Sequence, residues 1–412
     1  MQNTYLVGGA VRDKLLGLPV HERDWVVVGS TPEALLAKGF KPIGKDFPIF
    51  LEPNTQEEYA LARTERKTGK GYYGFECYAR PDVTLEQDLS RRDLTINAMA
   101  ETLEGEIIDP FGGQQDLKNK ILRHVSPAFS EDPVRVLRVA RFAARLAPLG
   151  FTVAAETQDL MRTMVTSGEV DALVAERVWQ EMVRALGEKD SAQFFEVLRS
   201  CGALQRLWPA LDKLWGIPQP AQHHPEIDTG VHTMMALGIA CQLSTDTVIR
   251  FAVLCHDLGK GDTPPKEWPS HRGHEERGVA RIQEFCRRYR VPSEYKELAV
   301  LVSRFHLHCH RVAELRSDTL LKTLERLDAF RQPERFEKFL LACEADARGR
   351  AGLETAQYPQ AARMRRAYQV AKAVSVQPLI AMGLEGAVLG ERLHQERVRA
   401  IEGDLKPMPP IQ

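Results

Sequence analysis

The chain has 412 residues, of which 43% are hydrophobic and 27% are charged, and its formal net charge is -1. This composition excludes a disordered or collagen-like chain, and the length predicts two to four domains. Because no apolar run approaches the roughly 20 residues of a membrane span and no signal-peptide pattern precedes Leu6, we expect a cytoplasmic protein without a membrane partner.

The chain opens with an apolar strand, a Gly-Gly turn and a short helix. The glycines Gly8 and Gly9 precede a helix that begins near Ala10, so the backbone can approach a triphosphate at the helix N-terminus. Arg12 is placed to add a charge-assisted hydrogen bond to the same phosphates. A plain turn is the alternative, and the two glycines alone do not separate these interpretations.

Two carboxylates follow at the head of an extended run. Glu22 and Asp24 are two residues apart before the stretch 25–28, so we expect both side chains on the same side of one strand. Such a pair can hold two divalent cations about 3.5 to 4 Å apart, which clamp the attacking hydroxyl and the leaving pyrophosphate of an in-line displacement. Oxygen ligands favour Mg²⁺. Glu22 and Asp24 are the predicted catalytic residues and metal ligands.

Adjacent arginines form the next motif. Arg91 and Arg92 precede Asp93 and an apolar, amide-bearing helix. We predict that Arg92 contacts the triphosphate, whereas a capping and salt-bridge role is the simpler interpretation of Asp93. Glu65 follows a strand and is a candidate third carboxylate, with a surface ion pair as the alternative.

The apolar periodicity changes along the chain. Residues 1–126 combine helices such as 31–38 with short β-branched or aromatic runs at 25–28, 48–51 and 59–62, which is typical of an α+β module. From about 127 onward apolar residues recur at three- and four-residue steps, which predicts helices throughout. The Pro-rich stretch 215–225 predicts a connection between two helical domains.

Four motifs occur together, LVGGAVRD at 6–13, ERD at 22–24, RRDLTINA at 91–98 and EDPVRVLR at 131–138. With them the chain resembles the bacterial class II tRNA nucleotidyltransferases, the CCA-adding enzymes, and among these the multifunctional members that carry an HD hydrolase domain. The resemblance runs through most of the chain. It implies template-independent addition of C, C and A to the 3′ end of tRNA from CTP and ATP, in tRNA maturation and repair.

The resemblance also implies an architecture and a set of site residues. It implies an α+β polymerase-β-like nucleotidyltransferase head (1–126), followed by an all-α nucleobase-recognition neck (127–222), an HD body (223–330) and a tail (331–412). Many members have Asp where this chain has Glu22, which keeps the ligand oxygen for Mg²⁺ on a longer arm. Carried over by position, the residues implied to contact the nucleotide are Gly9, Arg12, Arg92, Arg138 and Arg141.

Base choice without a template needs side chains that read a base edge. Asp132 and Arg135 are three residues apart, so in a helix near residue 131 they would be neighbours on one face. Cytosine and adenine share an amino donor beside a ring-nitrogen acceptor, which an aspartate and an arginine match, whereas uracil and guanine present the opposite pattern. An exposed helix ion pair is the alternative. The Gly-rich, aromatic loop 68–78 is the expected mobile element in the switch from C to A, and its presence favours full CCA addition.

Histidines gather later in the chain, where nine of the twelve lie between His223 and His310. His256-Asp257, with His232 upstream, resembles the HD phosphohydrolase pattern, and the downstream candidates are His271, His274 and His306. Imidazole and carboxylate suit a transition metal such as Ni²⁺ as well as Mg²⁺. The resemblance implies that the site activates water for the hydrolysis of phosphomonoesters, including 2′-nucleotides, and of 2′,3′-cyclic phosphates. The distal aspartate of the pattern is left open between the run 306–310 and Asp346.

Two other classes of protein share parts of this pattern. A bacterial poly(A) polymerase shares the front motifs but usually carries a strongly basic extension, against which the sequence pI of about 6.9 argues. An HD-type nucleotide hydrolase without polymerase activity would have no use for Glu22 and Asp24. We therefore expect tRNA, CTP and ATP as partners, and a monomer or weak homo-oligomer.

Overall fold

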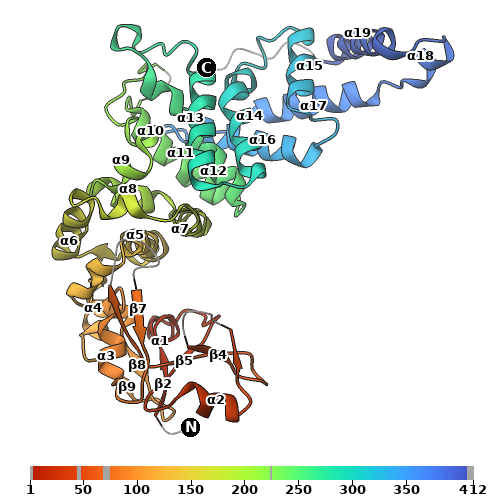
Figure 1. Cartoon of the computed structure of the whole chain (residues 1–412). Helices are drawn as coiled ribbons and strands as arrows, with labels where there is room; N and C mark the ends of the chain where they lie inside the picture. The colour runs from red at the N-terminus through yellow and green to blue at the C-terminus, as the bar shows by residue number, and fades with distance from the viewer. Residues whose placement is uncertain (1–2, 44–47, 68–74, 223–224, 406–412) are drawn as a thin grey trace. The chain divides into compact units, whose positions relative to one another are not determined.

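The computed structural model describes residues 3–43, 48–67, 75–222 and 225–405, and for 65–67 and 75–77 it describes the backbone alone. The chain divides into two compact units, 1–207 (unit 1) and 208–412 (unit 2), and each is described by itself (Figure 1).

Unit 1 begins with a mixed seven-stranded sheet of order β3-β4-β5-β2-β1-β8-β9. Its strands β2 and β5 are parallel, and the other neighbouring pairs are antiparallel. The strands are β1 (Thr4–Val7), β2 (Asp24–Val27), β3 (Lys41–Pro42), β4 (Ile49–Leu51), β5 (Glu58–Leu61), β8 (Ala100–Glu101) and β9 (Ile107–Ile108). A separate antiparallel hairpin joins β6 (Thr64–Lys67) to β7 (Phe75–Tyr78).

Short helices connect these strands where the sequence supplies caps. Thr31 accepts a hydrogen bond from the Ala34 amide and Pro32 opens α2 (Pro32–Ala37), which confirms the predicted helix over 31–38. Thr84 and Gln87 form a reciprocal capping box at α3 (Leu85–Ser90). The remaining short helices are α1 (Gly9–Leu15), η1 (Thr95–Asn97) and α4 (Gly113–Asn119).

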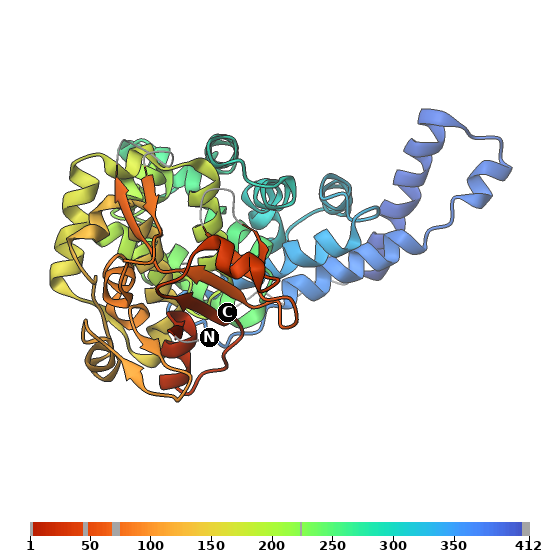
Figure 2. The same cartoon turned by 60° about the horizontal axis from the view of Figure 1, so that its bottom comes forward.

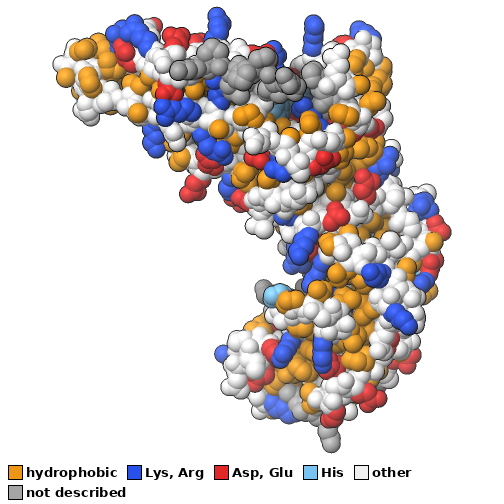
Figure 3. All heavy atoms as spheres, turned by 180° about the vertical axis from the view of Figure 1, so that it is seen from behind, with side chains coloured by type: hydrophobic (Ala, Val, Ile, Leu, Met, Phe, Trp, Pro, Cys, Tyr) orange, Lys and Arg blue, Asp and Glu red, His pale blue; other side chains and the backbone are white. Residues whose placement is uncertain are grey.

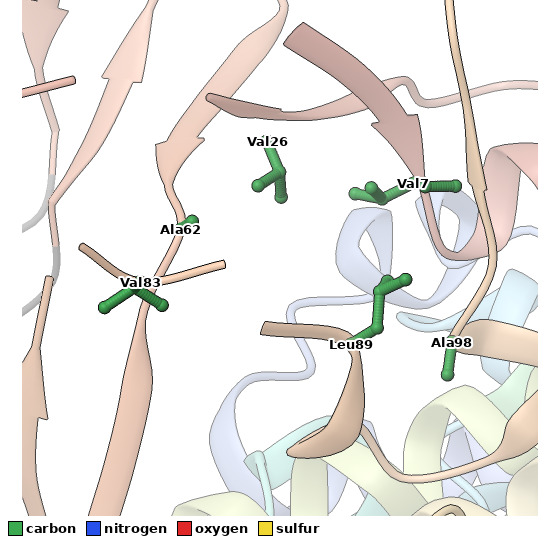
Figure 4. Close-up of a cluster of buried hydrophobic side chains, with 7 residues drawn as sticks. Val7, Val26, Ala62, Val83, Leu89 and Ala98 are labelled. Carbon is green, nitrogen blue, oxygen red and sulfur yellow. The ribbon is translucent and has the colours of Figure 1, made fainter. Parts of the chain in front are cut away.

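One hydrophobic cluster ties the sheet to α3 (Figure 4). Leu89 of α3 is completely buried and packs with Val7 of β1 and Val26 of β2. The other members are Ala62, Val83, Ala98 and Ala100. Because β1 and β2 carry the Gly-Gly turn and Asp24 at their ends, this cluster fixes the position of both.

Helices fill the rest of unit 1, and α5 packs against α7 and α8 (Figure 1). Their bounds are η2 (Pro127–Glu131), α5 (Val134–Leu146), η3 (Ala147–Leu149), α6 (Ala155–Thr166), η4 (Glu169–Ala172), α7 (Ala175–Gly187), α8 (Ala192–Ser200) and α9 (Ala203–Leu207). The prediction of helices throughout is wrong at one place, because β11 (Thr152–Val153) pairs in parallel with β10 (Ile121–Leu122). Gly150, whose φ lies in the left-handed region, ends η3. The β-branched residues Thr152 and Val153 that follow then form the strand that pairs with β10.

Unit 2 is helical, and α11, α12, α14 and α16 pack against one another with α13 beside α14 (Figure 1). The bounds are α10 (Pro209–Asp212), α11 (Thr229–Leu243), α12 (Thr247–Cys255), η5 (Leu258–Asp262), η6 (Pro265–Glu267), α13 (His274–Tyr289), α14 (Ser293–His310), α15 (Ser317–Arg326), α16 (Pro333–Arg348), α17 (Pro359–Ala373), α18 (Gln377–Ala381) and α19 (Gly386–Asp404). The described part of the stretch 215–225 contains no helix, as predicted.

The far end of unit 2 is an extended arm of α17, α18 and α19, seen in both ribbon views (Figures 1 and 2). Its tip carries exposed apolar side chains, with Met382 72% and Val388 60% exposed. Acidic and basic side chains alternate over the face drawn in Figure 3, in keeping with the net charge of -1. Among the described residues, no helix is long and apolar enough to cross a bilayer.

We predict that Leu89→Ala lowers the free energy of unfolding by about 2–5 kcal/mol, because it leaves a cavity in the cluster that joins α3 to the sheet. Urea unfolding followed by tryptophan fluorescence measures the change. The control is Leu36→Ala on α2, where the side chain is 47% exposed and the expected change is within about 0.5 kcal/mol. Equal losses in the two variants would contradict the assignment of this core.

Candidate functional sites

Asp24 lies at a meeting point of three segments. It is the first residue of β2, where it faces Val7, the last residue of β1 before the Gly-Gly turn. On the other side, the parallel strand β5 places Glu58 opposite Asp24. Glu22 precedes β2 by two residues, so the strand is shorter than the run that the sequence predicts. Asp24 is therefore flanked by a glycine turn on one side and a carboxylate on the other.

The three carboxylates influence one another. Burial raises the pKa of Asp24, Arg92 partly offsets this, and Glu22 adds to it. Burial also raises the pKa of Glu58, with further contributions from Asp24 and Glu22. Carboxylates that repel each other in this way favour a cation between them. The cluster therefore suits divalent metal ions, and Glu58 is a third acidic candidate that the sequence did not single out.

Arg92 lies over the Gly-Gly turn. Gly8 has a φ of 71°, and a Cβ at this position would lie 2.9 Å from Nη1 of Arg92. The other terminal nitrogen of Arg92 donates to Oδ2 of buried Asp88 at 3.1 Å. Only glycine combines this backbone conformation with the close approach of the guanidinium. The predicted phosphate-contact residues Arg92 and Gly9 are thus brought to the turn beside Asp24.

Three more predicted nucleotide-contact residues meet at one aromatic ring. The guanidinium carbons of Arg12, Arg138 and Arg141 lie 5.1, 5.7 and 4.6 Å from the ring centroid of Phe142. Arg12 comes from α1, and the other three residues come from α5. Cation–π contacts of this length stabilise each guanidinium by roughly 0.5–1 kcal/mol or more. The cluster joins α5 to the helix that follows the glycine turn.

Each of these arginines also has an acidic partner. Arg12 contacts Asp13 at 2.8 Å, Arg138 contacts Asp93 at 2.7 Å, and Arg141 contacts Glu181 at 2.6 Å. Burial alone would raise the pKa of Asp93, but Arg138, Asn97 and the Leu94 amide outweigh it and hold that pKa well below its ordinary value. Asp93 therefore has the predicted ion pair, but the predicted capping role is wrong, because Leu94 is the N-cap residue of η1 and this helix has no side-chain cap.

The predicted helical pair of Asp132 and Arg135 needs a correction. Asp132 precedes α5 in an extended conformation (φ -115°, ψ 105°), because a residue before proline is disfavoured in the helical region. Its carboxylate caps the Val134 amide at 3.1 Å and pairs with Arg177 of α7 instead of Arg135. Asp132 and Arg135 are therefore not neighbours on one helix face.

Arg135 is held by backbone carbonyls. Its Nη1 donates to the carbonyl of Ala128 at 2.7 Å, and its Nη2 donates to the carbonyl of Arg91 at 2.6 Å. The side chain is buried, with 7% of the residue exposed. Through the second contact, Arg135 connects α5 to the segment that carries Arg92.

The histidines of unit 2 converge on two buried carboxylates. Nε2 of His232 lies 3.1 Å from Oδ1 of Asp346, and Nε2 of His256 lies 3.6 Å from the same oxygen. Nε2 of His274 and Nε2 of His306 lie 3.3 and 3.8 Å from Oδ1 of Asp257. Two groups of three potential metal ligands result, one around Asp346 and one around Asp257, and all six residues are buried. Of the candidates for the distal aspartate, Asp346 is thus the carboxylate that lies beside His232 and His256.

The ring orientations suit metal binding. In His256, His274 and His306, Nδ1 lies 2.6–2.9 Å from the backbone carbonyl of a residue one turn earlier. Donation from Nδ1 to that carbonyl directs Nε2 toward the carboxylates, as in many histidine ligands. Nε2 of His256, Nε2 of His274 and Oδ1 of Asp257 are buried without a hydrogen-bond partner. These orphaned atoms fit a bound metal ion.

The electrostatics of this cluster also favour a cation. Burial lowers the pKa of His256, but Asp257 and Asp346 outweigh it and raise that pKa to about 9. Burial lowers the pKa of His306 to about 3. Lys260 approaches Oδ2 of Asp257 at 2.6 Å. Asp257 and Asp346 therefore favour a bound cation. His306, whose lowered pKa keeps its imidazole uncharged, does not neutralise their negative charge.

The other histidines of the predicted block lie outside both groups. His271 binds the carbonyl of Pro218 at 2.8 Å, and His308 contacts Thr323. His310 bridges Oδ2 of Asp346 at 2.6 Å and the hydroxyl of Tyr358 at 2.8 Å, so it orients a candidate ligand. His223 and His224 lie outside the described residues, as do the side chain of Glu65 and most of the loop 68–78.

Family models match most of the chain. The poly A polymerase head domain matches residues 4–123, the model described as "Probable RNA and SrmB-binding site of polymerase A" matches 150–214, and the HD domain matches 229–331. The chain is 64% identical over 398 residues to the multifunctional CCA protein of Nitrosococcus oceani, covering 97% of each chain. It is 63% identical over 399 residues to that of Thioalkalivibrio sulfidiphilus, covering 97% of this chain and 98% of the relative.

Solved structures share the fold. A CCA-adding enzyme in complex with CTP has a TM-score of 0.66 at 20% identity, covering 98% of this chain and 88% of that chain. The Bacillus stearothermophilus CCA-adding enzyme in complex with CTP has a TM-score of 0.63 at 22% identity, covering 98% and 90%. The Thermotoga maritima CCA-adding enzyme complexed with tRNA has a TM-score of 0.63 at 19% identity, covering 98% and 88%.

We predict that in Arg138→Met the free energy of unfolding changes less between pH 7 and pH 2.5 than it does in the parent. In the parent the lowered pKa of Asp93 adds stability above its unfolded pKa of about 3.9, and this contribution is lost as the pH falls below that value. Without Arg138 the folded pKa of Asp93 rises, so stability at pH 7 falls while the loss on acidification becomes smaller. Urea unfolding between pH 2.5 and 7 measures both effects. Arg145→Met on the same helix leaves the Asp93 pair intact and is the control; an equally reduced change there would contradict the assignment.

Proposed function

The chain belongs to the family of multifunctional CCA proteins, and from this premise we infer that it adds C, C and A to the 3′ end of tRNA from CTP and ATP without a nucleic-acid template. Membership confirms the family resemblance of the sequence motifs, and the poly A polymerase head domain followed by an HD domain confirms the predicted fold class. The alternative of a bacterial poly(A) polymerase is not supported, because five relatives at 59–64% identity are all multifunctional CCA proteins.

The observation that carries this proposal is the position of Asp24 between the glycine turn and Glu58. Glu22 and Asp24 would hold Mg²⁺, whose chemistry is to lower the pKa of the attacking hydroxyl and to neutralise the pyrophosphate. The 3′ hydroxyl of tRNA would attack the α-phosphorus of the nucleotide and give its proton to solvent, while the bond from that phosphorus to the β-phosphate oxygen breaks and pyrophosphate leaves. Glu58, opposite Asp24 in the register, would support the same cluster.

The arginines would orient the triphosphate. Arg92 over the turn beside Asp24 is suited to the phosphates, and so is the backbone at Gly9. Arg12, Arg138 and Arg141, fixed around Phe142, would extend this set of arginines from α1 to the middle of α5. Because their ion pairs hold them in place before the nucleotide arrives, little reorganisation is needed on binding.

Base choice would follow at the head of α5. Asp132 would accept a hydrogen bond from the amino group of cytosine or adenine, whereas Arg135, held by the carbonyls of Ala128 and Arg91, would position this segment instead of touching the base. A wrong base would leave buried polar groups unpaired, which can give discrimination of about 10⁴ in a dry site. We expect Asp132→Ala to relax the choice between CTP and UTP more than it damages metal binding.

We predict that Asp24→Asn lowers the rate of CCA addition by at least about 10³-fold, because it removes a carboxylate charge from the metal cluster. Incorporation of labelled CTP into tRNA that lacks its CCA end measures the rate. Glu57→Gln is the matched control, because Glu57 lies beside Glu58 on the chain but accepts from the Trp25 indole. Parental activity of Asp24→Asn would refute the site.

A second activity is supported by the paired ligand groups of unit 2. We propose a metal-dependent phosphohydrolase with two metal ions, one held by His232, His256 and Asp346 and the other by Asp257, His274 and His306. A transition metal such as Ni²⁺ or Mn²⁺ suits this donor set and would supply an activated water. The substrates would be phosphomonoesters, 2′-nucleotides and 2′,3′-cyclic phosphates.

We predict that the chain binds two Mn²⁺ or Ni²⁺ ions in unit 2 and that Asp346→Ala removes one of them. Metal analysis after gel filtration gives the stoichiometry, and hydrolysis of a 2′,3′-cyclic phosphate gives the activity, which Asp346→Ala should abolish while CCA addition persists. His308→Ala on α14 is the control, since His308 contacts Thr323 and belongs to neither ligand group. Unchanged stoichiometry in Asp346→Ala would exclude this ligand.

A further inference from the structure

The carboxylate of Asp132 is held by one arginine from a different helix. Nη1 of Arg177 donates to Oδ1 of Asp132 at 3.1 Å, and Nη2 donates to Oδ2 at 2.8 Å. The pair is largely shielded, with 28% of the Arg177 side chain and 19% of the Asp132 side chain exposed. Arg177 lies in the first turn of α7, 45 residues along the chain from Asp132.

Two parallel hydrogen bonds from a planar guanidinium fix the plane of a carboxylate. A third bond, from the Val134 amide to Oδ1 at 3.1 Å, fixes the same group from the backbone side. A carboxylate has about four lone-pair positions, so these three bonds leave one acceptor position, on Oδ2. Asp132 can therefore accept one hydrogen bond from a base, and its direction is set by Arg177.

An ionised carboxylate only accepts hydrogen bonds, so it can pair with the amino donor of cytosine or adenine but not with the carbonyl of uracil or guanine.

We propose that Arg177 is a specificity-determining residue for nucleotide choice, acting through Asp132 as a positioning residue rather than by touching the base. The proposal rests on the CCA-adding function inferred above and on the assignment of base reading to Asp132. It predicts that loss of Arg177 raises the use of UTP relative to CTP and the use of GTP relative to ATP together. In each pair, the wrong base presents a carbonyl acceptor where the correct base presents an amino donor. A residue that only stabilised the fold would lower the use of all four nucleotides alike.

The test compares three variants by single-nucleotide incorporation into tRNA ending before the first C and before the A. For Arg177→Ala we expect the ratio of kcat/KM for CTP over UTP, and for ATP over GTP, to fall by about tenfold or more, with kcat for CTP changed less than threefold. Arg177→Lys keeps the charge without the planar fork, so it should restore thermal stability but not selectivity.

The matched control is Arg206→Ala. Arg206 of α9 makes a comparable two-pronged contact with Asp171 of η4 in the same unit, and neither residue belongs to the predicted base-reading set. Its selectivity should equal that of the parent. Melting temperatures by circular dichroism separate folding losses from selectivity, and Arg177→Lys carries the test if Arg177→Ala does not fold.

The outcomes separate the two proposals. If the parent does not extend tRNA, the CCA-adding function itself fails. If the parent is active and Asp132→Ala loses selectivity while Arg177→Ala and Arg177→Lys retain it, the role of Arg177 is refuted. Full recovery of selectivity in Arg177→Lys would also overturn it, because charge alone would then be sufficient.

Discussion

A carboxylate removed from water needs a cation beside it, and in both units this requirement determines which side chains meet. In unit 1, Asp88 is completely buried, yet Arg91 and Arg92 hold its pKa below the ordinary value against the effect of burial. In unit 2, Asp257 and Asp346 are equally buried and are surrounded by imidazoles and Lys260. The acidic partners are as necessary as the basic ones, since a buried, unpaired charge of either sign would destabilise the folded state.

The ion pairs of unit 1 do more than stabilise the fold, because they also fix the orientation of the guanidinium groups. Arg12 is completely enclosed by Asp13, Asn97 and the Phe142 ring, so its orientation is set before any ligand binds. A side chain fixed in this way loses little conformational entropy when a phosphate arrives. A free surface arginine would have to lose that entropy at every binding event. In the proposed nucleotide site, this network of pairs would hold the guanidiniums in place before the ligand binds.

The sequence predicted the local part of this arrangement well. Strand, turn and cap signals lie within a few residues, so β2, α1 and α2 could be placed from the pattern alone, as could the clustering of histidines. Partners from distant segments left no such signal. Arg177 looks like an ordinary residue of an amphipathic helix, and Glu58 gains meaning only from its register with Asp24. The error at Asp132 arose because three-residue spacing was assumed helical, although the proline at 133 disfavours helical backbone at the residue before it.

The two candidate metal sites meet the same electrostatic requirement in different surroundings. The side chains of Asp24 and Glu22 remain open to solvent although neighbouring atoms partly desolvate Asp24, and the charge of Arg92 opposes the resulting rise in the pKa of Asp24. Such a cluster suits an ion that exchanges with solvent and arrives with a nucleotide, which is the behaviour of Mg²⁺ with its retained waters. Around Asp257 and Asp346 all six candidate ligands are buried, and imidazole supplies most of the donors. That set favours transition metals that stay bound between turnovers, so a chelator should deplete the two sites at different rates, the exposed one first.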